Sequence, residues 1–302
     1  MLSHVIVTTL VSIVMPSLNQ ANYIELAIKS VLEQKYRYIE LIVADGGSTD
    51  GTIQLLESLA ARDVRLRWFS ELDNGPAHAL NKALTQVRGT IIGWLNSDDL
   101  YENGTVERAV TVLNNNINCL MVYGHGQHID SHGRYISDYP TYPPSTPLDQ
   151  FSKGCFICQP TVFFKRSLYL MLGKLDESLV TAFDFEYWLR AFQSFPDRIG
   201  FVNCVQAYSR IHDDCITFRQ RRKVALEGME LLAKYLGYAP KEWLLTYVVE
   251  MLRCAQTSSE INKLKVDVNE FRLKSDQLVN PKEVPILEVE IEQLFKINNK
   301  SR

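Results

Sequence analysis

Two adjacent carboxylates follow one apolar run of this sequence, and a third acid ends another. Asp98 and Asp99 follow "IIGWL" within "NSDD", and Asp45 closes "IELIVAD". Neighbouring carboxylates repel each other unless a cation lies between them or one of them is protonated. Mg²⁺ and Mn²⁺ prefer oxygen ligands, and such an ion would also neutralise charge on a leaving diphosphate. The pair therefore predicts a divalent cation site, with an aspartate N-cap on the next helix as the alternative for one of the two.

The stretch "VADGGSTDGT", Val43 to Thr52, places acids, glycines and hydroxyls where an apolar run meets an amphipathic one. Residues of these types are common in turns and helix caps. The same composition suits a nucleotide site, because an acid at the tip of a strand can bind a nucleotide that glycines allow to approach the backbone. Both interpretations stay open from these residues alone.

The elements that must position these acids alternate between short apolar runs and helix-length amphipathic runs, from Val11 to about Leu113. The first amphipathic run has apolar residues at helical spacing, namely Ile24, Ala27, Ile28, Val31 and Leu32. Four strand-then-helix units with continuous apolar strands predict a mostly parallel, doubly wound α/β sheet covered on both faces. Ligands bind such sheets outside the carboxyl ends of the strands, so we expect four polar segments at one edge: 16–20, 44–50, 70–75 and 96–99.

Beyond Asn114 the pattern changes to a strand and hairpin, with turn signals at Asp130 to Gly133, and then to a proline-rich loop at 139–147. A strand entering a helix, an amphipathic helix entered at Asp184 and a further strand follow, and from about Thr217 the chain is mostly helical. This tail carries a heptad seam interrupted at Ser275, formed by Ile261, Leu264, Val268, Phe271 and Leu278. We expect the seam to pack against the main domain instead of forming a coiled coil.

The bulk composition is that of an ordinary soluble globular protein. Of 302 residues, 46% are hydrophobic and 22% are charged, and the formal net charge of -3 argues against a nucleic-acid partner. The opening "MLSHVIVTTLVSIVMPS" lacks a basic leader and is too short to span a bilayer, so it predicts a buried strand and a cytoplasmic protein. We accordingly expect free thiols, with the cysteines of "CFIC" as two buried thiols instead of a zinc or redox pair.

Two further surface motifs allow a functional and a plain interpretation. The basic run "RQRRK", Arg219 to Lys223, could contact a phosphate or a membrane surface, but a solvated start of a helix is the interpretation we favour. The histidines of "HGQHIDSH", His125, His128 and His132, have a metal-like composition, but a hairpin with polar tips explains them more simply.

Taken in order, the motifs resemble the inverting glycosyltransferases of family 2. The resemblance rests on "VSIVMPSLNQANYIELAIKSVLEQKYRYIELIVADGGSTDGT", "SELDNG", "GWLNSDDLY", "QPTVFFKRSLY", "GKLDESL", "FDFEYWLRA" and "YSRIH", and it covers roughly residues 10 to 215. It implies a nucleotide-diphospho-sugar transferase (GT-A) fold and a divalent cation, Mn²⁺ or Mg²⁺. It also implies transfer of a sugar from a nucleotide donor, by our expectation a UDP-sugar, to an acceptor hydroxyl with inversion at the anomeric carbon.

The same resemblance assigns roles to individual residues. Asp45 matches the acid that contacts the donor's nucleobase, Pro16 and Ser17 flank that pocket, and Asp98 and Asp99 match the end of the metal motif. We also expect Asp73, Asn96 and Arg210 at the nucleotide-sugar, Arg210 by pairing with phosphate, and His212 at the metal or the diphosphate. The sequence departs from the family pattern at four positions, where relatives often carry an acid: Gly46, His78, Asn96 and Phe183.

Asp184 matches the family's catalytic base. An acceptor hydroxyl is a poor nucleophile until a positioned base accepts its proton. A helix cap is the alternative for an aspartate at this place in the sequence.

These inferences give a GT-A-like catalytic domain at 1–216, with a nucleotide-sugar half at about 1–115 and an acceptor half at about 116–216, and a helical extension at 217–302. The expected function is an inverting, metal-dependent glycosyltransferase of bacterial surface polysaccharide biosynthesis, acting on a glycan or lipid-linked glycan. We expect it in the cytoplasm, with peripheral association at the inner membrane face and a homo-oligomer through the C-terminal helices as further options. The alternatives are a non-catalytic nucleotide-sugar-binding subunit and a nucleotidyltransferase, which would want a basic loop after the first strand that "PSLNQANY" lacks.

Overall fold

The computed structural model describes residues 9–300, with side chains to 298, so Met1–Thr8 of the predicted N-terminal strand lie outside the described residues. The chain forms two compact units. One contains the residues up to 146 together with 156–212, and the other contains 147–155 together with the residues from 213 onward. The second unit therefore includes a segment that precedes its helices by about sixty positions in the sequence.

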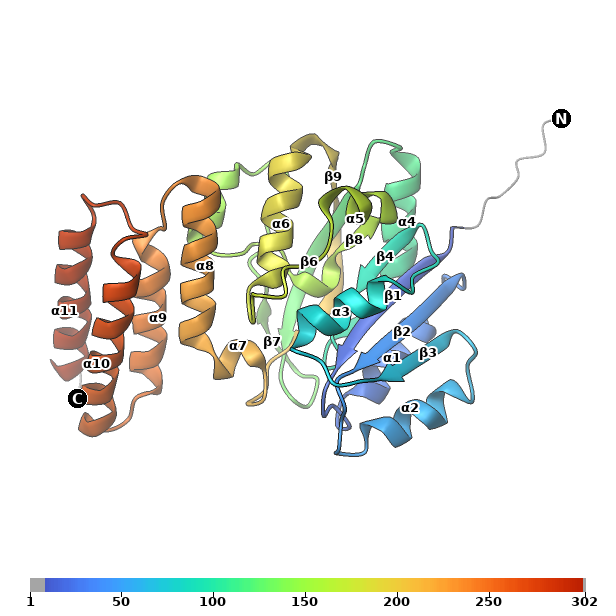
Figure 1. The fold of residues 1–302 in the computed structure, drawn as a ribbon, viewed down its shortest axis with the longest axis horizontal. Helices are drawn as coiled ribbons and strands as arrows, with labels where there is room; N and C mark the ends of the chain where they lie inside the picture. Colours follow the sequence, from blue (N-terminus) through green and yellow to red (C-terminus); the bar gives the residue numbers. More distant parts are fainter. Residues whose placement is uncertain (1–8, 301–302) are drawn as a thin grey trace. The chain divides into compact units, whose positions relative to one another are not determined.

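The first unit is an α/β fold built on one mixed sheet (Figure 1). Its strands are β1 Val11–Ser17, β2 Ile39–Asp45, β3 Leu66–Ser70, β4 Ile91–Trp94, β5 Leu100–Tyr101, β6 Met121–Ile129, β7 Tyr135–Asp138, β8 Phe163–Lys165 and β9 Ile199–Arg210. Among the described residues they follow the order β3-β2-β1-β4-β8-β6-β9-β5, and β7 pairs with β6. The strands β1 to β4 are parallel, and β8 lies antiparallel between β4 and β6. The predicted α/β class with a mostly parallel sheet is confirmed.

The helices of this unit are α1 Ile24–Leu32, α2 Thr52–Ala60, α3 Pro76–Leu84, α4 Thr105–Asn115, α5 Arg166–Leu172 and α6 Phe183–Ser194. Every residue of β1 and β2 is buried, as expected for strands covered on both faces. Val11, Ile13 and Met15 alternate along β1 and share an apolar cluster with the inward faces of α1 and α4. The five residues of α1 predicted at helical spacing are the ones that α1 buries.

The second half of this unit contains the predicted hairpin and one short strand that the sequence did not predict. The hairpin of β6 and β7 turns at Gly133, whose φ of 83° suits glycine. The two-residue strand β5, which pairs with β9, was not predicted. All six cysteines are free thiols; of the "CFIC" pair Cys158 is buried, but Cys155 is only half-buried.

The second unit consists of the helices α7 Ile216–Arg219, α8 Arg221–Leu236, α9 Lys241–Cys254, α10 Ser258–Ser275 and α11 Val284–Lys300, with the 3-10 helix η1 Leu148–Lys153. Four residues of the predicted heptad seam lie on α10, and the fifth, Leu278, follows its end. These four are buried in one cluster with apolar residues of α8, α9 and α11, so the expectation that the seam packs against the main domain is wrong. Helices of its own unit cover this face because three of them present matching apolar stripes. A capping box of Thr257 and Glu260 begins α10.

Gly228 of α8 lies against the ring of Trp243 of α9. A Cβ atom at this position would lie 2.0 Å from the ring of Trp243, whose indole N–H donates to the carbonyl of Ser152 at 3.0 Å. Because that hydrogen bond fixes the indole, we expect Gly228→Ala to destabilise the protein by about 1–2 kcal/mol, overpacking outweighing the better helix propensity of alanine. Urea unfolding followed by tryptophan fluorescence measures this. Glu230→Ala, at an exposed position of the same helix, is the matched control and should leave the unfolding midpoint unchanged.

Candidate functional site

The carboxyl ends of the parallel strands meet at one edge of the sheet. Ser17 at the end of β1 pairs with Asp45 at the end of β2, and Asp45 pairs in turn with Ser70 at the end of β3. The strand β4 runs parallel to β1 and leads into Asn96 and Asp98. The predicted gathering of the strand-end residues at a single edge is therefore what the fold produces.

Asp45 organises the loop that follows β2. Its carboxylate is 1% exposed, and one oxygen accepts from the backbone N–H groups of Gly47 and Ser48 at 3.0 and 2.9 Å and from the Ser70 hydroxyl at 2.7 Å. The Ser48 hydroxyl donates to its other oxygen and accepts from the N–H of Asn19, which ties this loop to the one after β1. The carboxylate is thus occupied by its own surroundings, and a contact with a nucleobase stays a prediction.

The "NSDD" turn places its two acids in different surroundings. Asp99 is 3% exposed and accepts from the N–H of Arg210 at 2.8 Å, and the amide of Asn96 lies 3.4 Å from its other oxygen. Burial raises the pKa of Asp99 well above its ordinary value, and the negative charge of Asp98 adds to the shift. Neither acid caps the next helix, because α4 begins at Thr105 after Gly104.

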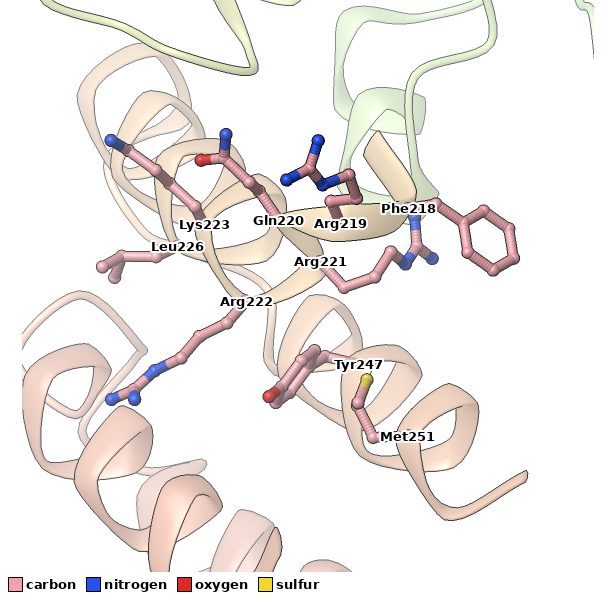
Figure 2. Close-up of a pocket in the computed structure, with 9 residues that line it drawn as sticks. All are labelled: Phe218, Arg219, Gln220, Arg221, Arg222, Lys223, Leu226, Tyr247 and Met251. Atoms are coloured by element: carbon pink, nitrogen blue, oxygen red, sulfur yellow. The ribbon is translucent and has the colours of Figure 1, made fainter. Parts of the chain in front are cut away.

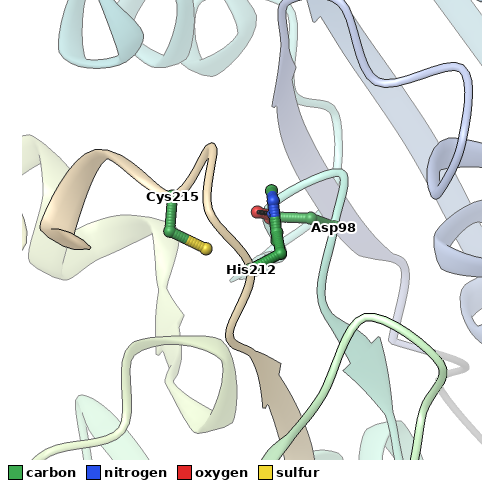
Figure 3. A group of neighbouring side chains, drawn as sticks. All are labelled: Asp98, His212 and Cys215. Atoms are coloured by element: carbon green, nitrogen blue, oxygen red, sulfur yellow. Dashed lines mark hydrogen bonds and ion pairs between the residues drawn. The ribbon is translucent and has the colours of Figure 1, made fainter. Parts of the chain in front are cut away.

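Asp98 faces His212, the residue that follows the end of β9 by two positions (Figure 3, which also draws Cys215 of the second unit). The carboxylate oxygen of Asp98 and Nε2 of His212 are 3.0 Å apart, and the Tyr23 ring lies 4.7 Å from the imidazole ring. Two ligand atoms bound at right angles, each about 2.1 Å from one ion, would be separated by about 3 Å. Carboxylate and imidazole are also ligands that Mn²⁺ accepts. The pair therefore fits a divalent cation.

Arg210 is a buried cation that holds the turn in place. It is 4% exposed; Nε donates to the carbonyl of Asp98 at 2.7 Å, and Nη1 donates to the carbonyl of Asp130 at 3.0 Å. Its guanidinium also lies 5.0 Å from the centre of the Tyr23 ring. The side chain joins β9, the "NSDD" turn and the β6–β7 hairpin, a structural role that the sequence did not indicate. Its contact with phosphate stays a prediction.

Asp184 lies in the first turn of α6, half-buried, and its carboxylate accepts from the N–H of Phe185 at 2.7 Å. The preceding residue, Phe183, stacks on Trp94 at the end of β4, with 5.5 Å between ring centres and 16° between ring planes. The Trp94 indole N–H donates to the side-chain oxygen of Asn96 at 3.0 Å. A chain of contacts thus connects the start of α6 with the "NSDD" turn. Two of the positions that depart from the family pattern, Asn96 and Phe183, both contact Trp94.

Glu186, the other acid of that first turn, is engaged elsewhere. It is 3% exposed and pairs with Arg190 at 2.8 Å, and Arg190 also donates to the carbonyls of Leu172 and Lys174. Its role is therefore structural, and Asp184 is the half-buried acid of this turn.

The basic run Arg219–Lys223 borders a hollow of about 470 Å³ within the second unit (Figure 2). Arg221 pairs with Glu250, and Arg222 with Asp267. Arg219 and Lys223 are exposed, and neither has an ion pair within the described part of the chain. The helix α8 begins at Arg221, within this run, as the favoured interpretation predicted, and Phe218 beside the run is 55% exposed. Across residues 9–300, none of the helices has the length and apolar character that a membrane crossing requires.

The fold and this edge define the GT-A class of α/β transferases. Residues 12–171 match the family described as glycosyl transferase family 2, and the chain belongs to that family. An uncharacterized glycosyltransferase of Rickettsia conorii is 32% identical over 217 residues, which are 68% of this chain and 35% of that protein. Chondroitin synthase of Escherichia coli is 30% identical over 187 residues, 62% of this chain and 27% of that protein. The chain thus spans about a third of the length of the first curated relatives it matches.

Solved structures share the fold at low sequence identity. TarS 1-349 of S. aureus in complex with UDP-GlcNAc aligns with a TM-score of 0.64 and 18% identity, over 97% of this chain and 91% of that one. The mannosyltransferase PcManGT of Pyrobaculum calidifontis, in complex with GDP-Man and Mn²⁺, aligns with a TM-score of 0.59 and 19% identity, over 96% of this chain and 87% of that one.

The Asp98–His212 pair leads to a metal-binding prediction. Because each side chain offers one ligand atom to the same point, we expect Asp98→Asn and His212→Ala each to weaken Mn²⁺ binding by more than the ~10-fold typical of losing an outer partner of a ligand. Electron paramagnetic resonance of free Mn²⁺, measured with and without nucleoside diphosphate, follows the binding. Asp197→Asn, an exposed acid of the same unit, is the control. Equal Mn²⁺ affinity in all four proteins would contradict the assignment.

Proposed function

We propose that this chain transfers a sugar from a nucleotide-diphospho-sugar to an acceptor hydroxyl, with inversion and with a divalent cation. The observation that carries the proposal is the stacking of Phe183 on Trp94, because it connects the helix whose first turn carries Asp184 to the strand that leads into the turn carrying Asp98. Phe183 precedes the proposed base in the sequence, and Asn96, which accepts from the Trp94 indole, lies two residues before the proposed cation ligand Asp98. The bound donors named for TarS and PcManGT support a nucleotide-sugar as the class of donor.

In the proposed reaction, Asp98 and His212 would hold the cation, and the cation would neutralise charge on the leaving diphosphate. Asp184 accepts the proton of the acceptor hydroxyl while the acceptor oxygen bonds to the anomeric carbon. The bond from that carbon to the diphosphate oxygen breaks, and its electron pair leaves with the nucleoside diphosphate. Attack from the face opposite the diphosphate inverts the anomeric configuration. Arg210 keeps the "NSDD" turn in position throughout, since its guanidinium binds the Asp98 carbonyl.

A substitution at the proposed base tests the function. We expect Asp184→Asn to lower kcat for release of nucleoside diphosphate by about 10²–10⁴-fold, because the amide cannot accept the hydroxyl proton, while donor affinity stays unchanged. The assay follows diphosphate release from UDP-sugars with Mn²⁺ and a panel of glycan and lipid-linked acceptors. Asp197→Asn should retain full turnover. Undiminished release by Asp184→Asn would remove Asp184 from the reaction.

We also propose that the acceptor is a lipid-linked glycan met at an anionic bilayer on the cytoplasmic side. This rests on the exposed pair Arg219 and Lys223 beside the exposed ring of Phe218, a combination of free cations and apolar surface that suits anionic headgroups and the layer beneath them. The kinship with chondroitin synthase supports a glycan as the acceptor's polar part.

Vesicle binding tests this surface. Each basic side chain near an anionic surface contributes about 1 kcal/mol, so reversing both charges in Arg219→Glu with Lys223→Glu should lower partitioning onto vesicles containing phosphatidylglycerol by at least ~10-fold. Co-sedimentation measures the bound fraction. Lys263→Glu with Lys274→Glu, two exposed positions of α10, makes the same change in net charge and should bind as the native protein does. Equal losses in the two double variants would mean that net charge alone governs binding.

A further inference from the structure

A bulge in the sheet opens a hollow beside β6 and β9. Along the paired strands β9 advances from 202 to 205 while β6 advances from 124 to 125, so Asn203 and Cys204 have no partner residue on β6. The hollow has a volume of about 320 Å³, and the residues of β6, β7 and β9 that line it include His125, Gln127, Asp138 and Cys204. Bulges are frequent beside functional sites because they turn side chains out of the regular ladder. The volume lies at the small end of the range for ligand sites, which suits a small ligand.

The part of β6 that borders the hollow is held close to its neighbours. A Cβ atom at Gly126 would lie 2.2 Å from Sγ of the buried Cys158, so only glycine fits at this position. The N–H of Tyr139 donates to the Gly126 carbonyl at 2.9 Å. Because successive side chains of a strand point to opposite faces, His125 and Gln127 on either side of Gly126 share the face away from Cys158. The hollow is therefore a fixed feature of the packed sheet.

Three hydrogen-bond acceptors remain unused at this hollow. The Gln127 amide donates to Oδ1 of Asp138 at 2.9 Å, which leaves Oε1 of Gln127 and Oδ2 of Asp138 without a partner among residues 9–298. Nε2 of His125 lies 3.0 Å from Oδ1 of Asn203. Because that amide oxygen can only accept, Nε2 carries the hydrogen of the neutral imidazole, and Nδ1 of His125 is an acceptor as well. No lysine or arginine lines the hollow, so nothing of opposite charge offsets the Asp138 carboxylate.

The hollow lies two strands away from the turn that carries the proposed cation ligand. Gln127 on β6 pairs with Tyr208 on β9, and Tyr208 pairs with Leu100 on β5. Leu100 directly follows Asp99, the last residue of "NSDD". Neighbouring strands are ~5 Å apart, so Gln127 lies about 10 Å from the residue that follows this turn. A short glycan whose end lies at the turn would reach the hollow.

We propose that this hollow binds an uncharged sugar residue of the acceptor glycan, away from the hydroxyl that reacts; this rests on the glycosyl transfer proposed above. A sugar presents several hydroxyl groups that each donate one hydrogen bond, and the hollow offers acceptors to match them. A uronate carboxylate can only accept hydrogen bonds, and the Asp138 carboxylate would repel its charge. The hollow therefore selects neutral sugars over acidic ones.

The same assignment gives the run "HGQHIDSH" a function other than metal binding. Within residues 9–298, its histidines belong to no group of three side chains that could hold a metal ion. His125 lines the hollow, whereas the His128 ring packs against Tyr139 with 5.3 Å between ring centres. Only His125 and Gln127 of this run are therefore placed to bind a sugar hydroxyl.

Alkylation of Cys204 measures sugar binding without any turnover. Cys204 lines the hollow and is exposed, and Cys254 of the second unit is an exposed thiol that serves as the internal reference. The probes are the neutral trisaccharides of glucose, galactose, mannose and N-acetylglucosamine, with trigalacturonate as the acidic counterpart. At about ten times its Kd, a neutral trisaccharide that binds should slow iodoacetamide modification of Cys204 by ~10-fold and leave Cys254 unchanged, as peptide mass spectrometry would show. Trigalacturonate should give no protection.

Removing two of the acceptors separates the sugar site from the reaction centre. In Gln127→Ala combined with Asp138→Ala, we expect neutral trisaccharides to lose their protection of Cys204. KM for the acceptor that supports diphosphate release should rise by ~10-fold or more with kcat unchanged, because these hydrogen bonds hold the acceptor and take no part in the reaction. His132→Ala, at the exposed tip of the same hairpin, is the matched control and should behave as the native protein does.

The outcomes distinguish this site from the transfer itself. The inference is overturned, and the transfer left standing, if no neutral trisaccharide protects Cys204 or if trigalacturonate protects it equally well. The same holds if KM is unchanged in the double variant while its urea unfolding midpoint is native. Protection of Cys204 in a protein that releases no nucleoside diphosphate with any acceptor removes the transfer, and with it the role of the hollow as an acceptor site.

Discussion

The turn that carries Asp98 and Asp99 is held by a residue more than a hundred positions away. Arg210 donates its backbone N–H to the Asp99 carboxylate and its Nε to the Asp98 carbonyl, while Nη1 reaches the β6–β7 hairpin. A buried guanidinium without such acceptors would carry a large desolvation cost. These hydrogen bonds therefore hold the Arg210 side chain and the "NSDD" turn in place. Because His212 lies two residues after Arg210 on the same segment, the anchor also brings the imidazole to Asp98. The proposed metal site depends on this one buried side chain.

The parallel half of the sheet could be predicted because its information is local. Strands buried on both faces are continuously apolar, and α1 buries the residues that recur at helical spacing. The gathering of polar strand ends at one edge then follows from the geometry of parallel strands. The two-residue strand β5 had no such signal, because its existence depends on pairing with the distant β9.

The site could be predicted by residue type and only partly by role. Asp45, Asp98 and Asp184 lie in the elements where the sequence puts them, but hydrogen bonds from neighbouring loops decide what each carboxylate can do. The Asp45 carboxylate accepts from donors of its own loop and of the adjoining loop. The Trp94 indole contacts Asn96 and Phe183, two of the four residues that depart from the family pattern. Such pairings join residues far apart in the sequence, and no periodicity or motif records them. The packing of the α10 seam was mispredicted for the same reason, since an apolar stripe does not specify its partner.

The segment 147–155 has a consequence for how the chain can be divided. The backbone passes from the first compact unit to the second at 146, returns at 155 and leaves again at 212, so the helical unit is assembled from two separate stretches. Within it the carbonyl of Ser152 receives the indole of Trp243, and Phe151 is fully buried. Cutting the chain near 212 would therefore leave the 3-10 helix, with its buried Phe151, in the remaining sequence without the helices of its own unit. The C-terminal helices therefore form one unit with the segment 147–155. A truncated or fused form of the chain must keep 147–155 together with the residues from 213 onward.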